Sequence, residues 1–468
     1  MLPRIITRLV GWAVAIFYDI ERSGPPVPSG PLLVAANHPN ALVDPLVVFH
    51  TAGRRTRPLA KAPLFEQALV GTILRGLGGL PVYRRQDDPA LMHLNDRTFD
   101  AAVAALHEGG AVQIYPEGQS HSEPGLAPLR TGAARIALRA EAERGWTLGL
   151  RVQPVGLTYA RKHLFRGRAL AVYGEPIDVG VYRAAFEADE REGARALTEA
   201  IQDALERLTL NFEQAEDSEL VDVAERLYAS QKRLARPRDR PSMAERLPRL
   251  QRFATGVRWL RAADPDRLAR LRAATRRYLR LLALFGASEG DVPTRYRTGA
   301  VARYALRQLA MLVLVLPVAA AGTVVWLVPF VLTRHVAPRF RPRLDQVATY
   351  KVGAAILFFP LWWGALALLA FFGWGVRASL VTMALAPLAG LAAIAWRNLQ
   401  ATVREDVRVY LRAWRRTEAR DRMREQRAWL VGEMDAVADA WRADLDAAHA
   451  SAERIPAGES DAGRTTEA

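Results

Sequence analysis

The sequence contains no cysteine, and that absence removes several classes of chemistry at once. Disulfide bonds, thiolate catalysis, S-palmitoylation and cysteine-based zinc sites are all excluded. His, Asp and Glu residues do not cluster at ligand spacing either, so no bound metal and no resident cofactor are expected. A cysteine-free chain fits a reducing compartment.

Lysine is scarce, so the formal net charge of +15 and the pI near 10.5 come almost entirely from arginine. Such a balance predicts a polyanionic neighbour, which is nucleic acid, an anionic membrane face or a phosphorylated substrate. Half of the 468 residues are hydrophobic, so a large core is possible. At roughly 100 to 200 residues per domain, the length suggests two to four units.

The first 23 residues lack a small-x-small cleavage site, although Arg4 and Arg8 precede an apolar run from Leu9 to Tyr18. A signal peptide is therefore not expected. The run is also too short to cross a bilayer. We expect residues 1–23 to form an interfacial anchor helix, with aromatic residues at headgroup depth: Trp12, Phe17 and Tyr18.

Residues 24–182 alternate short apolar runs with helical patterns, which predicts an α/β domain with a mostly parallel sheet flanked by helices. The expected strands are Leu32–Ala36, Gly79–Tyr83, Ala111–Tyr115, Arg151–Leu157 and Leu170–Tyr173. The expected helices are Ala62–Gly76, Leu91–Glu108 and Gly132–Arg144.

The remainder of the chain is expected to be helical. Residues 183–300 form an Arg-rich accessory region, in which Asp264-Pro265 predicts a helix start. Residues 301–397 hold three apolar segments of membrane-span length, at 309–333, 352–376 and 378–396. The second and third predict a hairpin that turns near Gly373–Arg377. Residues 398–450 predict a basic helix, and residues 451–468 a disordered tail.

Three full crossings would leave one Arg-rich flank outside, against the positive-inside rule. If residues 309–333 instead turn back at Pro317 or Gly322, every basic flank stays cytoplasmic. We favour this re-entrant arrangement. A buried, soluble core helix is the alternative for each apolar segment, and segment lengths near 20 residues or more disfavour it.

Four stretches carry polar residues at or after predicted strands: Asn37-His-Pro-Asn-Ala-Leu-Val-Asp44, Gly78-Gly-Leu-Pro-Val-Tyr-Arg84, Tyr115-Pro-Glu-Gly-Gln-Ser-His121 and Val152-Gln-Pro-Val-Gly-Leu-Thr158. Segments that leave the strand ends of a mostly parallel sheet collect along one edge, where α/β proteins bind ligands. The four stretches are therefore expected to converge.

His38 and Asp44 are a candidate general base and its orienting carboxylate. Six residues of unbroken helix would rotate the two side chains by roughly 240°. Pro39 and Pro45 indicate that a turn brings them together instead. For an isolated H-x5-D pattern, the more frequent interpretation is a capping histidine and a surface aspartate.

Arg84 and Arg85 leave a predicted strand, and guanidinium suits bidentate contact with phosphate. A solvated strand end is the alternative. Glu117 and Gly118 follow another strand, where a glycine lets backbone approach a ligand and a carboxylate can bind a hydroxyl. An ordinary strand-to-loop turn is the alternative there. His121 is expected to be a loop residue or a partner of a site residue.

Together the four stretches resemble the hallmark blocks of the glycerol-3-phosphate and 1-acylglycerol-3-phosphate acyltransferase superfamily. They occur in the same order, over about residues 10 to 180. The spacing of five residues between His38 and Asp44, and the sequence PEGQSH at Pro116–His121, resemble the fungal-type glycerol-3-phosphate/dihydroxyacetone-phosphate branch and its bacterial relatives. That branch also carries C-terminal membrane segments after a helical region.

The resemblance implies that His38 is the catalytic base, Asp44 its partner and Arg84 a phosphate ligand. Arg85, beside it, is the fallback candidate for the phosphate contact. The resemblance places Glu117 and Gly118 at the acceptor site and Pro154 in the fourth block. The implied reaction moves a fatty acyl group from acyl-CoA or acyl-carrier protein to glycerol-3-phosphate, dihydroxyacetone phosphate, lysophosphatidate or another lysophospholipid. The chain would be an integral protein of the bacterial inner membrane, with its catalytic domain facing the cytoplasm.

Three rival interpretations remain. A hydrolase would need a G-x-S-x-G elbow, which Gly118–Ser122 does not provide. A nucleic-acid-binding protein is not expected, because no recognised motif appears and the basic residues flank apolar segments that would place them on anionic lipid. A catalytically silent membrane scaffold is disfavoured by the intact His38/Asp44 pair.

Overall fold

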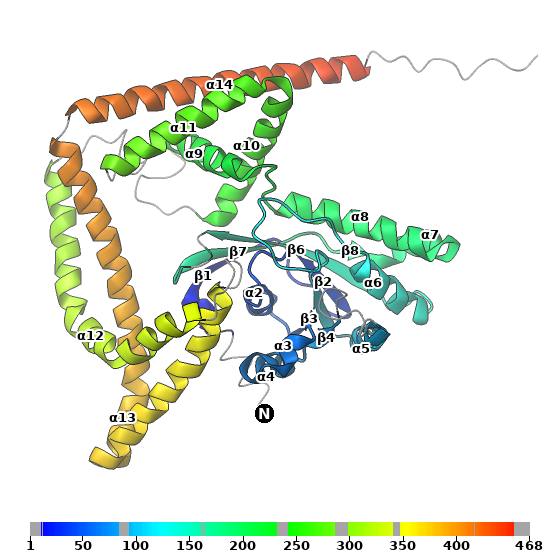
Figure 1. Cartoon of the computed structure of the whole chain (residues 1–468), viewed down its shortest axis with the longest axis horizontal. Helices are drawn as coiled ribbons and strands as arrows, with labels where there is room; N and C mark the ends of the chain where they lie inside the picture. The colour runs from blue at the N-terminus through cyan, green and yellow to red at the C-terminus, as the bar shows by residue number, and fades with distance from the viewer. Residues whose placement is uncertain are drawn as a thin grey trace, which may run out of the picture. The chain divides into compact units, whose positions relative to one another are not determined.

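The computed structural model describes residues 11, 13–83, 93–160, 162, 164–231, 242–285, 298–339, 347–415 and 417–453. An α/β domain occupies the N-terminal part of the chain, and long helices follow it (Figure 1). The expected fold class is confirmed: a mostly parallel, mixed sheet carries flanking helices, and a helical region with long apolar helices comes after it.

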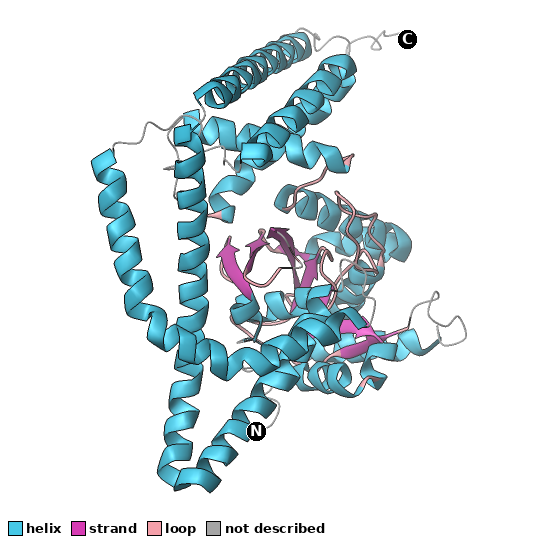
Figure 2. Ribbon diagram, turned by 60° about the vertical axis from the view of Figure 1, so that its left-hand side comes forward, coloured by secondary structure: helices cyan, strands magenta, loops and turns pink. Residues whose placement is uncertain are grey.

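The eight-stranded sheet has the order β1-β7-β6-β2-β5-β3-β4, with β8 paired to β6 (Figure 2 shows the strands in magenta). Its strands are β1 (Tyr18–Ser23), β2 (Leu32–Ala36), β3 (Thr56–Lys61), β4 (Leu80–Val82), β5 (Ala111–Ile114), β6 (Arg151–Ala160), β7 (Gly167–Tyr173) and β8 (Ile177–Asp178). The neighbours β6, β2 and β5 are parallel, so their carboxyl ends open on one edge.

Both faces of the sheet are covered, which explains why β2 is buried at every position. Successive side chains of a strand point to opposite faces. Leu33 and Ala35 accordingly pack with α5 (Asn95–His107), α6 (Gly132–Glu143) and α8 (Glu190–Leu208), whereas Leu32, Val34 and Ala36 pack with α2 (Val43–Thr51). The helices α3 (Pro63–Glu66), α4 (Ala68–Leu77) and α7 (Arg183–Ala188), with the 3-10 turn η2 (Val179–Tyr182), complete this part.

The N-terminal expectation needs correction. Residues 18–23, assigned to an interfacial helix, form strand β1, which pairs in parallel with β7. Phe17 and Tyr18 are buried in the core under the sheet rather than placed at a membrane surface. The alternation Tyr-Asp-Ile-Glu suits an edge strand with one apolar face. Residues 1–10 and Trp12 lie outside the described residues.

The boundary at residue 183 is also corrected. Helix α8 contributes Leu197, Ile201 and Leu205 to the core of the α/β domain, so it belongs to that domain and not to an accessory region. The chain divides into two compact units, the first made of residues 1–211, 241–248 and 296–406, and the second of residues 212–240, 249–295 and 407–468.

The second unit is helical, as expected from the sequence. It contains α9 (Ala215–Gln231), most of α10 (Met243–Ala263), α11 (Pro265–Phe285) and α14 (Thr417–Glu453). Asp264 caps α11, since its carboxylate accepts the Arg267 backbone N–H at 2.8 Å, and Pro265 occupies the first helical position. The buried carboxylate of Asp217 is neutralised by two guanidinium groups, those of Arg261 and Arg272.

Within the described residues, two helices are long and apolar enough to cross a membrane, judged by length and composition: α12 (Thr298–Arg339) and α13 (Val347–Arg415). Large hydrophobic side chains are exposed along both. Helix α13 is two helices joined at Gly375, whose φ of 82° and ψ of −173° are not helical. The break falls within the hairpin turn expected at residues 373–377.

Helix α12 differs from the re-entrant expectation. Its backbone stays helical from Thr298 to Arg339, through Pro317 and Gly322, so the chain does not reverse at either residue. Both views show a bend in this helix instead (Figures 1 and 2). A proline inside a helix removes one hydrogen bond and bends the axis without ending the helix. The side of the membrane on which each flank lies stays a prediction.

Candidate active site

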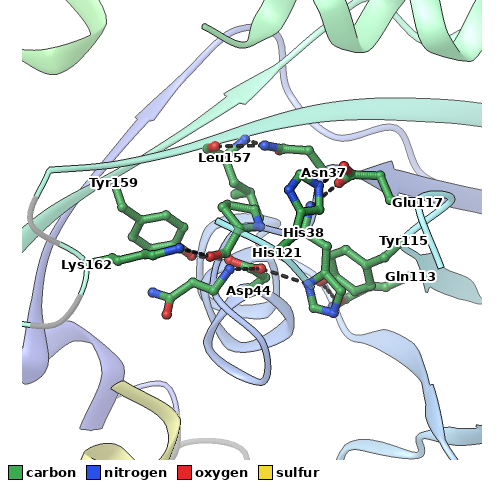
Figure 3. A network of polar contacts seen from close by, with 12 residues as sticks. Asn37, His38, Asp44, Gln113, Tyr115, Glu117, His121, Leu157, Tyr159 and Lys162 are labelled. Atoms are coloured by element: carbon green, nitrogen blue, oxygen red, sulfur yellow. Dashed lines mark hydrogen bonds and ion pairs between the residues drawn. The ribbon is translucent and has the colours of Figure 1, made fainter. Parts of the chain in front are cut away.

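A tight turn between β2 and α2 creates the His38–Asp44 pair (Figure 3). His38 lies just beyond β2, and Asp44 is the second residue of α2. Between them Ala41 adopts a positive φ of 41°, and the Asn40 carbonyl accepts the Val43 N–H at 3.0 Å. The turn brings His38 Nδ1 to 2.8 Å from Asp44 Oδ2. The juxtaposition predicted from Pro39 and Pro45 is confirmed.

The two members of the pair differ in exposure. The Asp44 side chain is fully buried, whereas 18% of the His38 side chain is accessible. Tyr115 stacks on the His38 ring, with 4.2 Å between the ring centroids. The imidazole is thus fixed by a carboxylate at one nitrogen and by an aromatic ring on one face, yet it can still be reached from outside. A neutral imidazole held this way can accept a proton from a bound hydroxyl.

Glu117 ties the third sequence block to the first. Its side chain is almost fully buried, and its Oε1 accepts the backbone N–H of His38 at 2.6 Å. Its Oε2 accepts the Ala127 N–H at 2.9 Å and also contacts His121 Nε2. An acceptor hydroxyl would have to displace one of these donors. The geometry therefore favours a role in holding the loop of His38 over the acceptor contact expected from the sequence.

His121 and Gly118 complete this loop. The His121 N–H bonds the His38 carbonyl at 3.2 Å, so both the ring and the backbone of His121 serve the contact between the blocks. Gly118 has a φ of +74°, and a Cβ there would lie 2.8 Å from Arg130 Nε. Only glycine fits this position without displacing Arg130. Within the described residues, no group of three or more His, Asp or Glu side chains is placed to hold a metal ion.

The fourth block meets the first through Asn37. Its amide donates to the Leu157 carbonyl at 3.0 Å and accepts the Leu157 N–H at 2.6 Å, which locks β6 to the chain just before His38. Pro154, the block's predicted site residue, lies inside the sheet opposite Ala35, and its carbonyl accepts the Gly174 N–H at 3.0 Å. Among the interactions of the described residues, Pro154 shares none with His38 or Asp44.

Two site expectations concern Arg84 and Arg85, which lie outside the described residues. A cation that the sequence reasoning missed is Lys162, whose ammonium donates to the Pro39 carbonyl at 2.6 Å and to Ser122 Oγ at 2.8 Å. It joins the loops that follow β2 and β5. The basic pair Arg161-Lys162 directly after β6 was the available signal.

Tyr159 was missed as well, although it donates its hydroxyl to Asp44 Oδ1 at 2.6 Å. It stands near the end of β6, beyond the fourth block. A tyrosine in a strand is ordinary core composition, so no sequence pattern distinguished it.

An apolar pocket adjoins the helix that carries Asp44. Its walls come from α2, α4 and the first turns of α13: Leu42, Val43, Pro45, Leu46, Val70, Ile73, Leu74, Leu77, Thr349, Val352, Gly353 and Ile356. Thr349 is the one side chain among them with a polar group. A pocket lined this way suits a hydrocarbon chain.

Comparisons with known proteins agree with these features. Residues 19–158 match the family model described as Acyltransferase. Glycerol-3-phosphate O-acyltransferase 2 of Saccharomyces cerevisiae is 38% identical over 135 residues, which are 29% of this chain and 18% of that protein. The 1-acyl-sn-glycerol-3-phosphate acyltransferase of Bacillus subtilis is 26% identical over 157 residues, 33% of this chain and 70% of that protein.

A solved structure, the 1-acyl-sn-glycerophosphate acyltransferase of Thermotoga maritima, aligns with a TM-score of 0.33 at 20% identity. The alignment covers 44% of this chain and 77% of that one. The present chain spans less than a fifth of the length of the yeast relative. The predicted resemblance is confirmed, and the segment that carries all four blocks, residues 19–158, is an Acyltransferase-family domain.

Proposed function

We propose that this protein is a membrane O-acyltransferase that moves a fatty acyl group from a thioester to a hydroxyl of a phosphorylated glycerol or a lysophospholipid. The observation that carries the proposal is the His38–Asp44 pair. A partly accessible imidazole stands 2.8 Å from a fully buried carboxylate, at the strand edge where the first, third and fourth blocks meet.

The chemistry follows from that pair. His38 takes the proton of the acceptor hydroxyl, and the oxygen attacks the thioester carbonyl carbon. The new C–O bond forms, the C–S bond breaks, and His38 returns the proton to the departing thiolate of coenzyme A or acyl-carrier protein. Asp44 holds the imidazole in one tautomer and stabilises the imidazolium. No nucleophilic side chain is needed, because the acceptor itself attacks.

Substrate placement is part of the proposal. The acyl chain enters the apolar pocket beside α2. Burial of its hydrocarbon surface there contributes a favourable free energy of about 25 cal/mol per Å². Arg84, with Arg85, holds the acceptor phosphate through charge-assisted hydrogen bonds. Glycerol-3-phosphate, dihydroxyacetone phosphate and lysophosphatidate all present a hydroxyl near a phosphate.

The proposal also places the protein in a membrane. The exposed apolar surfaces of α12 and α13 suit lipid, and the arginines that flank them favour an anionic, cytoplasmic headgroup layer. We place the catalytic domain on that side, in a bacterial inner membrane. There the lipid substrates and products partition near the site.

The test uses the full chain purified in detergent with acyl-labelled acyl-CoA and, separately, acyl-carrier protein. Each donor is offered with glycerol-3-phosphate, dihydroxyacetone phosphate, lysophosphatidate or another lysophospholipid. We expect acceptor-dependent transfer of label into lipid, lost in His38→Ala. Release of free fatty acid regardless of acceptor would identify a hydrolase, and no turnover with any pair would favour a scaffold.

A further inference from the structure

The carboxylate of Asp44 is fully buried and is contacted at both oxygens. Oδ2 lies 2.8 Å from His38 Nδ1 and accepts the Asn40 backbone N–H at 2.7 Å. Oδ1 accepts the hydroxyl of Tyr159 at 2.6 Å. A buried carboxylate is costly unless its oxygens are hydrogen-bonded. Tyr159 supplies a hydrogen bond to the oxygen that faces away from His38.

Tyr159 is itself firmly placed. It pairs with Ala169 across the antiparallel strands β6 and β7, and its ring meets that of Tyr18 edge-on, with 5.5 Å between centroids. Burial raises the pKa of Tyr159 well above its usual value, and the negative charge of Asp44 raises it further. The phenol stays protonated at every working pH and serves Asp44 only as a donor.

We propose that Tyr159 is a positioning residue for acyl transfer, which acts by fixing the plane of the Asp44 carboxylate so that Oδ2 faces the His38 ring. The assignment rests on the proposed function of His38 as base. A carboxylate held at one oxygen only can rotate about its Cβ–Cγ bond, and the torsion is soft. With Tyr159 on Oδ1 and Asn40 on Oδ2, rotation would break two hydrogen bonds.

This assignment also connects β6, the strand that carries the fourth block, directly to the His38–Asp44 pair. Pro154 lies within the sheet, whereas Tyr159 stands five residues later, at the open edge. Leu157, between them, already binds Asn37 through two hydrogen bonds. The end of β6 thus holds the first block at two points, before His38 and at Asp44.

The experiment compares Tyr159→Phe with Tyr173→Phe. Each removes one hydroxyl, from the half-buried Tyr159 or from the buried Tyr173, but the Tyr173 hydroxyl contacts Thr51 Oγ1 at 2.8 Å, in the last turn of α2 and away from the carboxylate. We expect Tyr159→Phe to lower kcat about tenfold, a change in activation free energy of about 1.4 kcal/mol. The KM values for donor and acceptor should change less than about twofold. Tyr173→Phe should leave kcat within about twofold of the wild-type value. It should lower the melting temperature by about as much as Tyr159→Phe does.

A second measurement distinguishes a positioning role of Tyr159 from a general destabilisation of the fold. If Tyr159 acts through Asp44, adding Tyr159→Phe to Asp44→Asn should cost less than about twofold further in the residual rate, because coupled residues are not additive. Full additivity, or unchanged kcat in Tyr159→Phe alone, would overturn the assignment and leave the proposed function standing. An inactive wild-type protein would instead overturn the proposed function, and the assignment with it.

Discussion

Glu117 Oε1 accepts the backbone N–H of His38 at 2.6 Å, so a carboxylate from the loop after β5 fixes the residue that follows β2. The other oxygen of Glu117 is occupied by Ala127 N–H and His121. This relationship changes what the PEG sequence is expected to do. Glu117 keeps His38 in place, and the acceptor contact inferred from resemblance is not needed to explain the burial of Glu117.

Glu117→Gln tests that interpretation. The substituted amide would turn an N–H group toward one of the donors that the carboxylate now satisfies, at a cost of about 1–3 kcal/mol for the unsatisfied group. We expect kcat to fall about 100-fold and the melting temperature to drop. Steady-state kinetics at varied acceptor concentration should show little change in KM. A large rise in acceptor KM with kcat preserved would return Glu117 to the acceptor site. Glu123→Gln, at an exposed position of the same loop, is the matched control.

The catalytic pair gives the second prediction. His38→Ala should reduce turnover by about 10⁴-fold, and Asp44→Asn should come close to it, because the imidazole loses its orienting charge. Both are measured by transfer of labelled acyl groups, beside expression and membrane insertion. His107→Ala is the control, since His107 ends α5 just before the amino end of β5, and its ring contacts the Ala140 carbonyl of α6. Wild-type turnover in His38→Ala would remove His38 from the mechanism.

Arg84 gives the third prediction. Arg84→Ala should raise the KM for a phosphorylated acceptor at least about tenfold, because a charge-assisted contact to phosphate contributes about 1.5–3 kcal/mol. The donor KM should stay near the wild-type value. Arg85→Ala serves as the neighbouring comparison and is expected to have the smaller effect. A change confined to the donor KM would assign Arg84 to the coenzyme or carrier instead.

Much of the fold and site could be predicted because local patterns and tertiary structure agree there. The turn at Pro39 and Pro45 predicted the His38–Asp44 contact, and the apolar run at residues 32–36 predicted β2 to the residue. Strand β1 could not be separated from the apolar run before it, because Tyr18 ends the run and starts the strand. Strand β3 was missed since Pro58 and two basic residues obscure its pattern. Tyr159 and Lys162 act through contacts that only the folded sheet creates.

The contact between α12 and α13 offers a stability test with its own control. Pro329 has no N–H, so the carbonyl of Val325, four residues earlier, lacks its helical partner. Trp362 of α13 donates its indole N–H to that carbonyl at 2.7 Å. Trp362→Phe should therefore lower the melting temperature in detergent by several degrees, from a loss of about 1 kcal/mol or more. Trp363→Phe, whose indole nitrogen is buried without a hydrogen-bond partner, should be tolerated. Equal losses in both variants would assign the effect to ring packing.

The last prediction concerns the sides of the membrane. Helix α13 breaks at Gly375, and Trp374 beside the break is 81% exposed. If the two arms of α13 cross and return, residue 342 and the helix near residue 420 lie on the same side, and residue 374 lies opposite. Five basic residues at the end of α12, at the start of α13 and between these helices favour the cytoplasm for that side: Arg334, Arg339, Arg341, Arg343 and Lys351.

Because the chain has no cysteine, maleimide labelling of a single introduced cysteine has no background from other positions of the protein. Pro342→Cys, Arg420→Cys and Trp374→Cys are labelled in intact cells with a membrane-impermeant maleimide, and again after permeabilisation. We expect residue 374 to react in intact cells and residues 342 and 420 to react only after permeabilisation. Reaction of residue 342 but not 420 in intact cells would place the two flanks of α13 on opposite sides. Reaction of both residues 342 and 420 in intact cells, with residue 374 protected, would instead indicate that α12 also crosses, and three full crossings would replace the arrangement in which every basic flank is cytoplasmic.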